Sequence, residues 1–371
     1  MKIISTTACP HDCPSTCTLD IEHDNDYIYK LKGNKDNTYT KGVICSKVSR
    51  YQYRTHNEDR LLYPLKRIGR KGSNDFKKVS WDEALDIVST KLLKIISEYG
   101  SEAIWPYFYA GTMGLIQRDG INRFRHEFNF SDQYSTICNA LPQAGWLAGV
   151  GSLMGPDPRE IEYSKVIVMW GGNPASTQVN FMKHVQNARK NNNAFLIVID
   201  PYLTKTARIA DLHIKLRPGT DGALACGIMK KIIENNKADY QYLKTHTKGF
   251  EELRVHLHKK SNVWASKICG VSEEKISELS KIICSNKKVY FRMGYGFTRQ
   301  RNGSFNMHAV TCIPTLKGAW KYKGGGAFYT NGDIYRIDKS FIEGLDFKDE
   351  NTRQLDQSRI APILNNNKEA L

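Results

Sequence analysis

Apolar positions in the second half of the chain recur in blocks typical of parallel strands that alternate with helices. Residues 166–170 (Val-Ile-Val-Met-Trp) and 194–199 (Ala-Phe-Leu-Ile-Val-Ile) are continuous apolar runs, as expected of strands covered on both faces. A third step passes through residues 213–221 into a helix predicted over 222–234, and a later strand spans residues 289–293. This alternation predicts a doubly wound α/β domain.

The first part of the chain predicts shorter elements. Residues 18–44 alternate apolar and polar side chains, with turns at 23–26 and 33–37, which is typical of short antiparallel strands. A further linker strand is predicted over residues 59–67. The pattern therefore predicts a small β-rich region before the first long helix.

That helix is predicted to begin after Ser80. Glu83 stands three residues later and completes a capping box, and Gly100 stops the helical pattern. Apolar residues recur at helical spacing between these limits, at Ala84, Leu85, Val88, Leu92, Ile96 and Tyr99. Residues 104–109 (Ile-Trp-Pro-Tyr-Phe-Tyr) then predict a strand that runs into a glycine turn over residues 110–114.

Three predicted strands in the second half end in turn-forming residues. These turns are Gly171-Gly172-Asn173-Pro174, Asp200-Pro201 and Pro218-Gly219-Thr220-Asp221. Ligands of doubly wound sheets bind beyond the carboxyl ends of the strands, and helix N-termini after such turns suit phosphate groups. The first turn lacks the G-x-G-x-x-G pattern of NAD sites, whereas Asp200 stands where an acid could hydrogen-bond a nucleoside. The pattern predicts a nucleotide-like ligand and does not favour NAD.

Composition is that of a globular protein of two or three domains. The chain has 371 residues, of which 40% are hydrophobic and 25% charged, and no apolar run is long enough to span a bilayer. Residues 1–8 lack the apolar segment of an export signal, so the expected compartment is the cytoplasm, where cysteines stay reduced. The net charge of +16 is spread along the chain without a compact basic run, which argues against nucleic-acid binding and leaves room for an anionic ligand.

Cysteines supply the strongest chemical signal in the sequence. Cys9, Cys13 and Cys17 recur at equal gaps on one short loop, and Cys45 follows from a distant turn. Prolines after Cys9 and Cys13 disfavour a helix there, which suits a loop wrapped around an inorganic centre. Four thiolates are what a cubane [4Fe–4S] cluster needs.

Three other interpretations of these cysteines are weaker. A structural zinc site usually pairs its thiols as two tight knuckles and not as three plus one. Disulfides need an oxidising compartment, and a radical enzyme that uses S-adenosylmethionine needs only three cysteines, with a shorter second gap than Cys13 to Cys17. An iron–sulfur cluster is therefore favoured. Cysteines in apolar helical or strand contexts are expected to be buried small hydrophobes, namely Cys226, Cys269, Cys284 and Cys312.

In their order along the chain, these motifs resemble those of the molybdopterin oxidoreductases, the dimethyl-sulfoxide-reductase-like enzymes that include formate dehydrogenases, nitrate reductases and polysulfide reductases. The similarity covers roughly residues 5–330. It consists of the N-terminal cysteines, Trp170-Gly-Gly-Asn-Pro, Asp200-Pro201, Arg217-Pro-Gly-Thr-Asp and Met293-Gly-Tyr-Gly. Members of that family hold molybdenum or tungsten between two molybdopterin guanine dinucleotides, with a [4Fe–4S] cluster nearby as electron relay.

The resemblance implies roles for particular residues. The cluster ligands would be Cys9, Cys13, Cys17 and Cys45. Lys47 matches the lysine that the family sets between cluster and pterin. Cys138, in Tyr-Ser-Thr-Ile-Cys-Asn-Ala, falls where the family places its protein ligand to the metal, and a thiolate suits a metal already bound by sulfur. Gly145 and Gly151 keep the family's spacing from that position.

Further residues correspond to positions that cradle the guanine dinucleotides in the family. They are Trp170, Gly171, Asn173, Asp200, Thr204, Pro218, Gly219, Asp221, Gly294, Gly296 and Gln300. Asp200 and Asp221 are the expected readers of the guanine nitrogens, because a carboxylate can accept two parallel N–H bonds.

The chain departs from the family's pattern in three places. The first cysteine gap holds three residues, Pro10-His11-Asp12, where the family often has two. Formate dehydrogenases place a histidine directly after the metal ligand, whereas this chain has Asn139, so the expected proton acceptor for formate oxidation is missing. The family is also roughly twice as long. The chain is therefore expected to be the N-terminal part of such an enzyme, from a split, truncated or partial gene, with exposed apolar surfaces meant for the rest.

The resemblance implies an α/β fold of several domains. Residues 1–60 are expected to form a small β-rich [4Fe–4S] domain, followed by Rossmann-like doubly wound α/β domains. Residues 61–135 would be the first part of one α/β domain, to which residues 336–371 return. Residues 136–335 would form the Rossmann-like domain that binds molybdopterin dinucleotide, and the family's C-terminal β-barrel domain is expected to be absent.

The implied function is a molybdenum- or tungsten-dependent oxidoreductase that passes electrons between a small substrate at the metal and the [4Fe–4S] cluster. Its implied partners are an electron-carrier protein or iron–sulfur subunit and a second chain that supplies the missing C-terminal domains. The alternative is a non-catalytic electron-relay or assembly subunit of the same fold without the metal. Retention of Cys138 and of the pterin turns argues against this alternative, whereas the short length argues for it.

Overall fold

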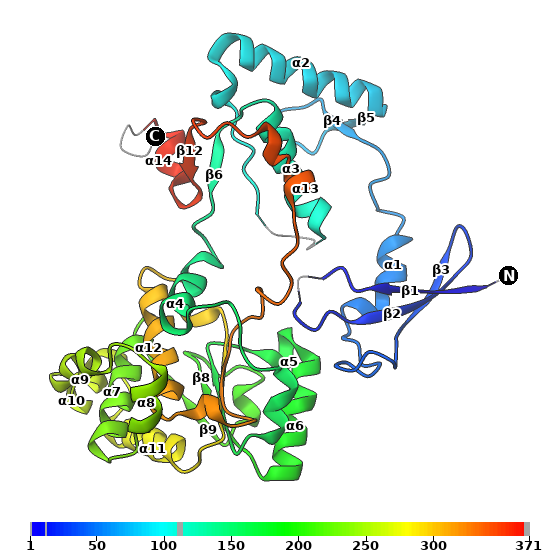
Figure 1. Ribbon diagram of the computed structural model, residues 1–371. Coiled ribbons are helices and arrows are strands. Elements are labelled where there is room, and N and C mark those ends of the chain that lie inside the picture. The colour runs from blue at the N-terminus through cyan, green and yellow to red at the C-terminus, as the bar shows by residue number, and fades with distance from the viewer. Residues whose placement is uncertain (1, 12, 110–113, 367–371) are drawn as a thin grey trace. The chain divides into compact units, whose positions relative to one another are not determined.

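The computed structural model describes residues 2–11, 13–109 and 114–366. By its internal contacts the chain divides into two compact units (Figure 1). The first unit contains residues 1–135 and 337–371, and the second contains residues 136–336. Each unit has its own clusters of buried apolar side chains.

The second unit is built on a five-stranded sheet in which the strands lie in the order β11-β10-β7-β8-β9. Their bounds are β7 (Val166–Trp170), β8 (Phe195–Ile199), β9 (Leu212–Ile214), β10 (Val289–Met293) and β11 (Gly326–Phe328). All neighbouring pairs in this sheet are parallel. The chain runs from β7 outward to β9 and then returns to place β10 and β11 on the other side of β7. This confirms the predicted doubly wound topology.

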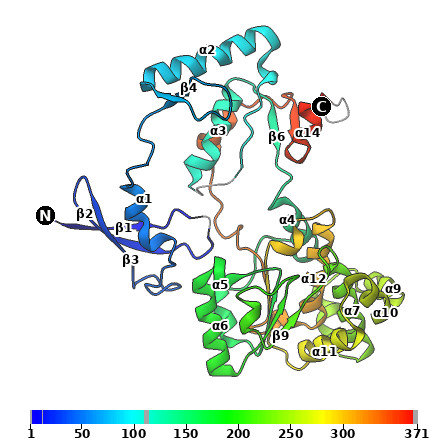
Figure 2. The same cartoon turned by 180° about the vertical axis from the view of Figure 1, so that it is seen from behind.

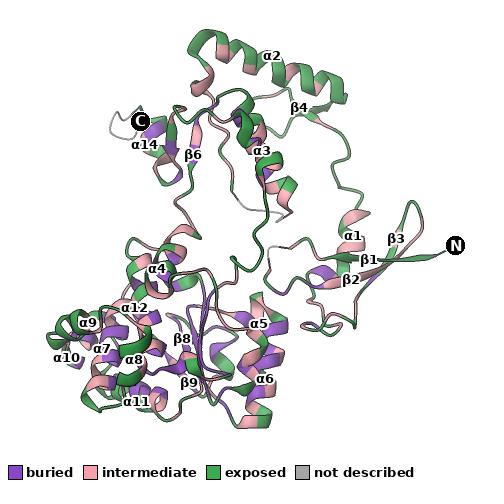
Figure 3. Ribbon diagram, in the orientation of Figure 1, coloured by how far each residue is buried: buried purple, intermediate pink, exposed green. Residues whose placement is uncertain are grey.

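Helices cover both faces of this sheet (Figure 2). One face carries α5 (Pro174–Thr177) and α6 (Val179–Asn192). The helices of the rest of the unit are α4 (Ala140–Val150), α7 (Asp221–Glu234), α8 (Tyr240–His246), α9 (Phe250–His258), α10 (Asn262–Cys269), α11 (Glu273–Cys284) and α12 (Gly303–Leu316). Alternate residues of β7 enter two separate apolar clusters, Ile167 with α6 and Val168 with α7 and α12. Burial on both faces explains the continuous apolar runs (Figure 3).

Helix α4 lies close against α12 because α4 has glycines where the two helices meet. A Cβ at Gly145 would overlap the backbone carbonyl of Ser304, and one at Gly149 would overlap the side chain of Thr311. Glycine is the residue that permits such an approach of two helices. Because α4 begins two residues after Cys138, this contact also fixes the turn that contains that cysteine.

The first unit begins with a three-stranded antiparallel sheet of β1 (Ile3–Ala8), β2 (Thr18–His23) and β3 (Ile28–Gly33). The short strands predicted within residues 18–44 are thus confirmed. Strand β1 was not predicted, since all six of its residues are exposed and it carries no alternation of buried and exposed positions. A small core of Cys17, Leu19, Leu31 and Val48 lies between this sheet and the following segment, which includes α1 (Tyr51–Thr55).

The helix predicted after Ser80 is α2 (Trp81–Tyr99). Ser80 Oγ accepts a hydrogen bond from the backbone N–H of Glu83 at 3.0 Å, and Gly100 ends the helix with φ +81°. No residue of α2 is buried. Over the described part of the chain, no helix combines the length and the apolar character needed to cross a bilayer.

Residues 104–109 do not form the predicted strand. Pro106 has no N–H to donate to a neighbouring strand, and the backbone carbonyl of Phe108 accepts from the side-chain amides of Gln133 and Gln357 at 2.9 and 2.8 Å. Strand β4 (Leu65–Arg67) is shorter than the predicted linker strand and pairs with β5 (Phe76–Lys78). Residues 110–113 of the predicted glycine turn lie outside the described residues, as does Asp12.

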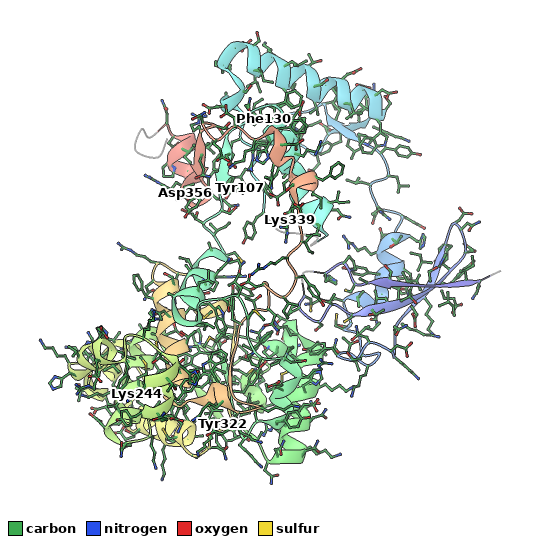
Figure 4. The ribbon with its side chains drawn as sticks, viewed as in Figure 1. Tyr107, Phe130, Lys244, Tyr322, Lys339 and Asp356 are labelled. Atoms are coloured by element: carbon green, nitrogen blue, oxygen red, sulfur yellow. The ribbon has the colours of Figure 1, made fainter. Side chains whose placement is uncertain are left out.

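Both ends of the chain contribute to the first unit. Its remaining elements are α3 (Leu115–Glu127), β6 (Asp132–Tyr134), α13 (Ser340–Glu343), β12 (Gln354–Asp356) and α14 (Ile360–Leu364). Strand β12 pairs in parallel with β6, so that Leu355 lies beside Gln133. Tyr107, Phe130 and Asp356, far apart in sequence, lie in this one region (Figure 4). Lys339 Nζ also lies 3.0 Å from a carboxylate oxygen of Asp119 on α3.

Candidate functional site

The four N-terminal cysteines come together at one end of the small antiparallel sheet. Cys9 follows β1 and Cys17 precedes β2, and the backbone N–H of Cys9 donates to the carbonyl of Cys17 at 2.8 Å. Cys9 and Cys45 both pack against the small apolar core that contains Cys17. Burial raises the pKa of the Cys9 thiol, and the nearby thiols of Cys45 and Cys13 add to the increase. None of the four forms a disulfide.

These donors fit the chemistry of an iron–sulfur cluster. The described residues contain no group of three or more histidine, cysteine, aspartate or glutamate side chains arranged to hold a single metal ion. A [4Fe–4S] cluster takes four thiolates around an object larger than one ion. Thiolates are soft ligands of the kind that such clusters require.

His11 and Lys47 are two further polar side chains in the segments that carry these cysteines. His11, between Cys9 and Cys13, has its Nε2 at 2.5 Å from Tyr51 Oη, and this hydrogen bond ties the cysteine loop to α1. Lys47 is exposed and directly precedes the short helix η1 (Val48–Arg50). It therefore lies in the segment that carries Cys45, and its position between cluster and pterin stays a prediction.

In the second unit, the predicted cofactor residues converge at the carboxyl edge of the parallel sheet. Trp170 is the last residue of β7, and Gly171 and Asn173 follow it. Asp200 and Thr204 follow β8; Pro218, Gly219 and Asp221 follow β9; Gly294, Gly296 and Gln300 follow β10. After β7 the chain continues to β8 and β9 on one side of it, whereas β10 pairs with β7 on the other side. The direction of winding therefore reverses between β7 and β10. Such a switch point is where ligands of doubly wound sheets bind.

Glycines allow the two turns at the switch point to lie directly against each other. The backbone N–H of Gly294 donates to the carbonyl of Trp170 at 2.8 Å, and that of Gly296 donates to the carbonyl of Gly171 at 2.9 Å. A Cβ at Gly294 would overlap the backbone of Gly171, which has φ +61°. The sequence thus needs glycine at these positions to form the turns at this edge.

Two buried carboxylates lie beside this switch point. Asp221 is 2% exposed and accepts hydrogen bonds from Trp170 Nε1 at 2.7 Å and from Gln300 Nε2 at 3.5 Å. Burial raises the pKa of Asp221 to about 6, and the charge of Asp200 adds to the increase. Burial also raises the pKa of Asp200. Within the described residues neither acid forms an ion pair, so both can accept N–H donors of a ligand.

Other predicted residues shape the same edge through contacts within the chain. Asn173 Oδ1 accepts from Thr206 Oγ1 at 2.8 Å, and Thr204 Oγ1 accepts from the backbone N–H of Ala207 at 3.0 Å. Gly219 has φ +86°, a conformation that favours glycine, and Pro218 is exposed in the same turn. These residues are therefore already engaged in forming the loops that a dinucleotide would contact.

Cys138 lies in the turn that leads into α4 and has φ +54°. Non-glycine residues rarely adopt this left-handed conformation, and such strain is concentrated at functional sites. Arg299 Nη2 donates to Cys138 Sγ at 3.3 Å. The side-chain oxygen of Asn139 accepts a hydrogen bond from the hydroxyl of Tyr329. The Cys138 thiol is thus half-buried and lies beside the cationic Arg299 side chain. The hydrogen bond from Tyr329 to Asn139 anchors the turn that contains it.

Three residues of this site were not predicted from the sequence, namely Tyr295, Arg299 and Tyr329. The rings of Tyr295 and Tyr329 meet edge to face with centroids 5.4 Å apart, and the guanidinium of Arg299 lies 5.9 Å from the Tyr295 ring. They follow β10 and β11, so only the folded sheet brings them to Cys138. One signal was present, because Arg299 directly precedes the predicted cofactor residue Gln300.

Comparison with known proteins assigns both parts of the chain to one family. Residues 4–57 match the molybdopterin oxidoreductase Fe4S4 domain, and residues 60–368 match molybdopterin oxidoreductase. The second match alone covers most of the chain. Together they agree with the resemblance seen in the sequence motifs.

Individual relatives point the same way. The chain is 34% identical over 363 residues to the probable oxidoreductase YoaE of Bacillus subtilis, a match that covers 97% of this chain and 53% of the relative. It is 30% identical to the dimethyl sulfoxide reductase DmsA of Escherichia coli, with 86% of this chain and 44% of the relative covered. The chain thus spans about half the length of these curated relatives.

A solved structure shares the fold. The acetylene hydratase from Pelobacter acetylenicus superposes with a TM-score of 0.66 at 23% sequence identity, over 86% of this chain and 44% of that protein. At this identity the likeness concerns the fold alone. From the two domain matches and the relatives above, we conclude that the chain belongs to the molybdopterin oxidoreductase family and carries that family's Fe4S4 domain at its N-terminus.

Proposed function

We propose that this chain is the catalytic subunit, or the N-terminal part of one, of a molybdenum- or tungsten-dependent oxidoreductase that uses two molybdopterin guanine dinucleotides and a [4Fe–4S] cluster. One observation carries the proposal. The strained Cys138 turn, with Arg299 at its sulfur, belongs to the same compact unit as the glycine turns and buried acids at the switch point. A structural cysteine needs neither the left-handed backbone nor the adjacent cation.

In this proposal each group of residues has a distinct task. Cys138 would be the protein ligand to the metal, which would supply two-electron chemistry at a position open to substrate. Asp200 and Asp221 would accept the N–H donors of guanine and orient the dinucleotides. The turns at Gly171 and Gly294 would bring backbone close to the pterin phosphates.

The distribution of charge supports an anionic ligand in the second unit. Residues 136–336 contain 29 lysines and arginines against 14 aspartates and glutamates, and so account for nearly all of the chain's net charge of +16. A positive unit attracts phosphate-bearing cofactors over long range. This electrostatic contribution adds to the local contacts at the sheet edge.

The remaining roles complete the proposed electron path. Cys9, Cys13, Cys17 and Cys45 would hold the cluster. Lys47 would lie between cluster and pterin, where its charge favours an added electron. The proposed partners are a small-molecule substrate, an electron-carrier protein or iron–sulfur subunit, and polypeptide equivalent to the other half of the relatives, in the cytoplasm. We further propose that residues 1–60, 61–135 with 336–371, and 136–335 are the three domains.

Elemental analysis of the anaerobically purified full-length protein tests the cofactor content. Iron together with molybdenum or tungsten, and a pterin fluorophore after oxidation, is the expected result. Iron without a heavier metal or pterin would instead favour an electron-relay subunit of the same fold. The assay does not depend on knowing the substrate.

Replacing Cys138 by alanine tests the proposed metal ligand. C138A should abolish turnover, measured as oxidation of reduced viologen by a panel that includes dimethyl sulfoxide, while the absorbance of the iron–sulfur cluster stays as in wild type. The matched control C284A removes a half-buried thiol of α11 that lies outside the site, and it should retain turnover. Wild-type rates in C138A would remove this cysteine from the mechanism.

A further inference from the structure

Building on the proposed role of Cys138 as metal ligand, we propose that Arg299 is a positioning residue that sets the reduction potential of the bound metal through the Cys138 sulfur. The contact is direct, with Arg299 Nη2 at 3.3 Å from Cys138 Sγ. A hydrogen bond from a cation to a sulfur ligand draws electron density away from that sulfur. The metal then receives less density, and its reduced state is stabilised.

The backbone on both sides of Arg299 is fixed, and the guanidinium also lies 5.9 Å from the centre of the Tyr295 ring. Arg299 follows the short helix η5 (Gly296–Thr298), whose last residue is fully buried. Gln300 donates from its backbone N–H to the carbonyl of Thr298 at 2.9 Å and from its side-chain amide to the carbonyl of Phe297 at 2.6 Å. A loop anchored before and after one residue presents that residue's side chain from a defined position.

The Cys138 turn has a second anchor that does not involve Arg299. The hydroxyl of Tyr329 donates to the side-chain oxygen of Asn139, and Tyr329 is itself buried, with its ring centroid 5.7 Å from that of Trp146. Close packing of α4 on α12 holds the turn from the other side. Removal of the Arg299 side chain therefore leaves the turn in place, and its effect on the sulfur can be measured separately from its effect on structure.

The same loop offers a matched control for the charge of Arg299. Arg301 stands two residues later and is also exposed, and the hydrogen bond that the structure shows at Cys138 Sγ comes from Arg299 and not from Arg301. R301Q and R299Q change the net charge of the protein equally. Only R299Q replaces the guanidinium at the sulfur by a shorter, neutral side chain, so a difference between the two variants isolates the direct contact.

The test is a potentiometric titration of the full-length holoenzyme, followed by the electron paramagnetic resonance signals of the metal and of the cluster. R299Q should lower the midpoint potential of the metal, because the sulfur donates more strongly once its hydrogen-bond donor is lost. R299K keeps a cation and should recover most of the shift. R301Q should leave the metal potential unchanged, and in all variants the cluster, whose proposed ligands belong to the other unit, should keep its potential.

The outcomes separate this inference from the function on which it rests. Wild-type protein without molybdenum or tungsten would overturn the proposed function and this inference together. A loaded wild type and a loaded R299Q with equal metal potentials would overturn the inference alone, as would an equal shift in R301Q. If R299Q and R299K both lost the metal while retaining iron, Arg299 would serve metal retention, and the proposed control of potential would be wrong.

Discussion

Asp221 is a buried acid that accepts a hydrogen bond from Trp170, and none of the residues that the structure describes forms an ion pair with it. With its pKa raised by burial from 3.8 to about 6, the ionised form costs roughly 3 kcal/mol of folding free energy at neutral pH. Proteins commonly retain such destabilising groups where function needs them. The proposed function would account for this destabilisation, because the carboxylate would accept N–H donors from a bound guanine.

D221N should therefore stabilise the cofactor-free protein in a pH-dependent way. The folded state of wild type binds the Asp221 proton more tightly than the unfolded state, so this group stabilises the fold below about pH 4 and its contribution is lost as pH rises through about 6. Asparagine does not titrate and still accepts from Trp170. Urea unfolding should show D221N more stable than wild type by about 2–3 kcal/mol at pH 7.5 and nearly equal to it at pH 4.

D346N provides the control for the loss of one carboxylate, because Asp346 is an exposed residue of the first unit, whereas Asp221 is a buried residue of the second. Urea unfolding of D346N at the same two pH values shows what the removal of an exposed carboxylate contributes. A D221N advantage that did not grow with pH would show that Asp221 is not a buried acid of this kind.

Single residues also show where sequence reasoning ends. Cys138 and Asp221 could be proposed as site residues because each stands in a motif of neighbouring residues, and Asp200 because it directly follows an apolar strand. Arg299 could not be proposed, since its contact with Cys138 joins residues 161 positions apart and depends on how the chain folds between them. No local pattern contains that information.

Among the elements, α4 is the one whose packing most directly supports the site. G145A should destabilise the protein by about 1–3 kcal/mol, because the added methyl group meets the backbone of Ser304 and separates α4 from α12. The matched control is G120A within α3, where a Cβ meets no atom within 4 Å. That variant should gain about 0.5–1 kcal/mol from higher helix propensity.

Urea unfolding at neutral pH measures both changes. Opposite signs for the same chemical substitution would confirm that helix contact, and not glycine content, decides the effect. If G145A were as stable as wild type, the described approach of α4 to α12 would be wrong.

Periodicity predicted the buried strands β7, β8 and β10 together with helix α2, and its failures have physical causes. The bounds of β7 and β10 were predicted to the residue because burial on both faces leaves runs of apolar residues, which only Arg292 interrupts in β10. Residues 104–109 have equally apolar side chains, but Pro106 and the amide partners of Phe108 keep them out of a sheet. The apolar spacing of α2 predicted the helix, but Leu85 and Val88 are 61% and 55% exposed, which the pattern could not show.

For the molecule as a whole, the division into units predicts which fragment folds alone. Residues 136–336 are continuous in sequence and enclose two complete apolar clusters, so this fragment should unfold cooperatively in urea. Residues 1–135 lack the segment that pairs with β6 and should show no comparable transition in their second half. A fragment 136–336 without a cooperative transition would contradict this reading of the contacts.

The parallel pairing of β12 with β6 has a consequence for synthesis on the ribosome. About two hundred residues separate these strands, and the entire second unit is translated between them. When residue 135 leaves the exit tunnel, β6 has no partner and its edge stays open until residue 356 appears. The interval coincides with the time in which the intervening unit can form its sheet, so a nascent chain stalled within it would present that bare strand to chaperones.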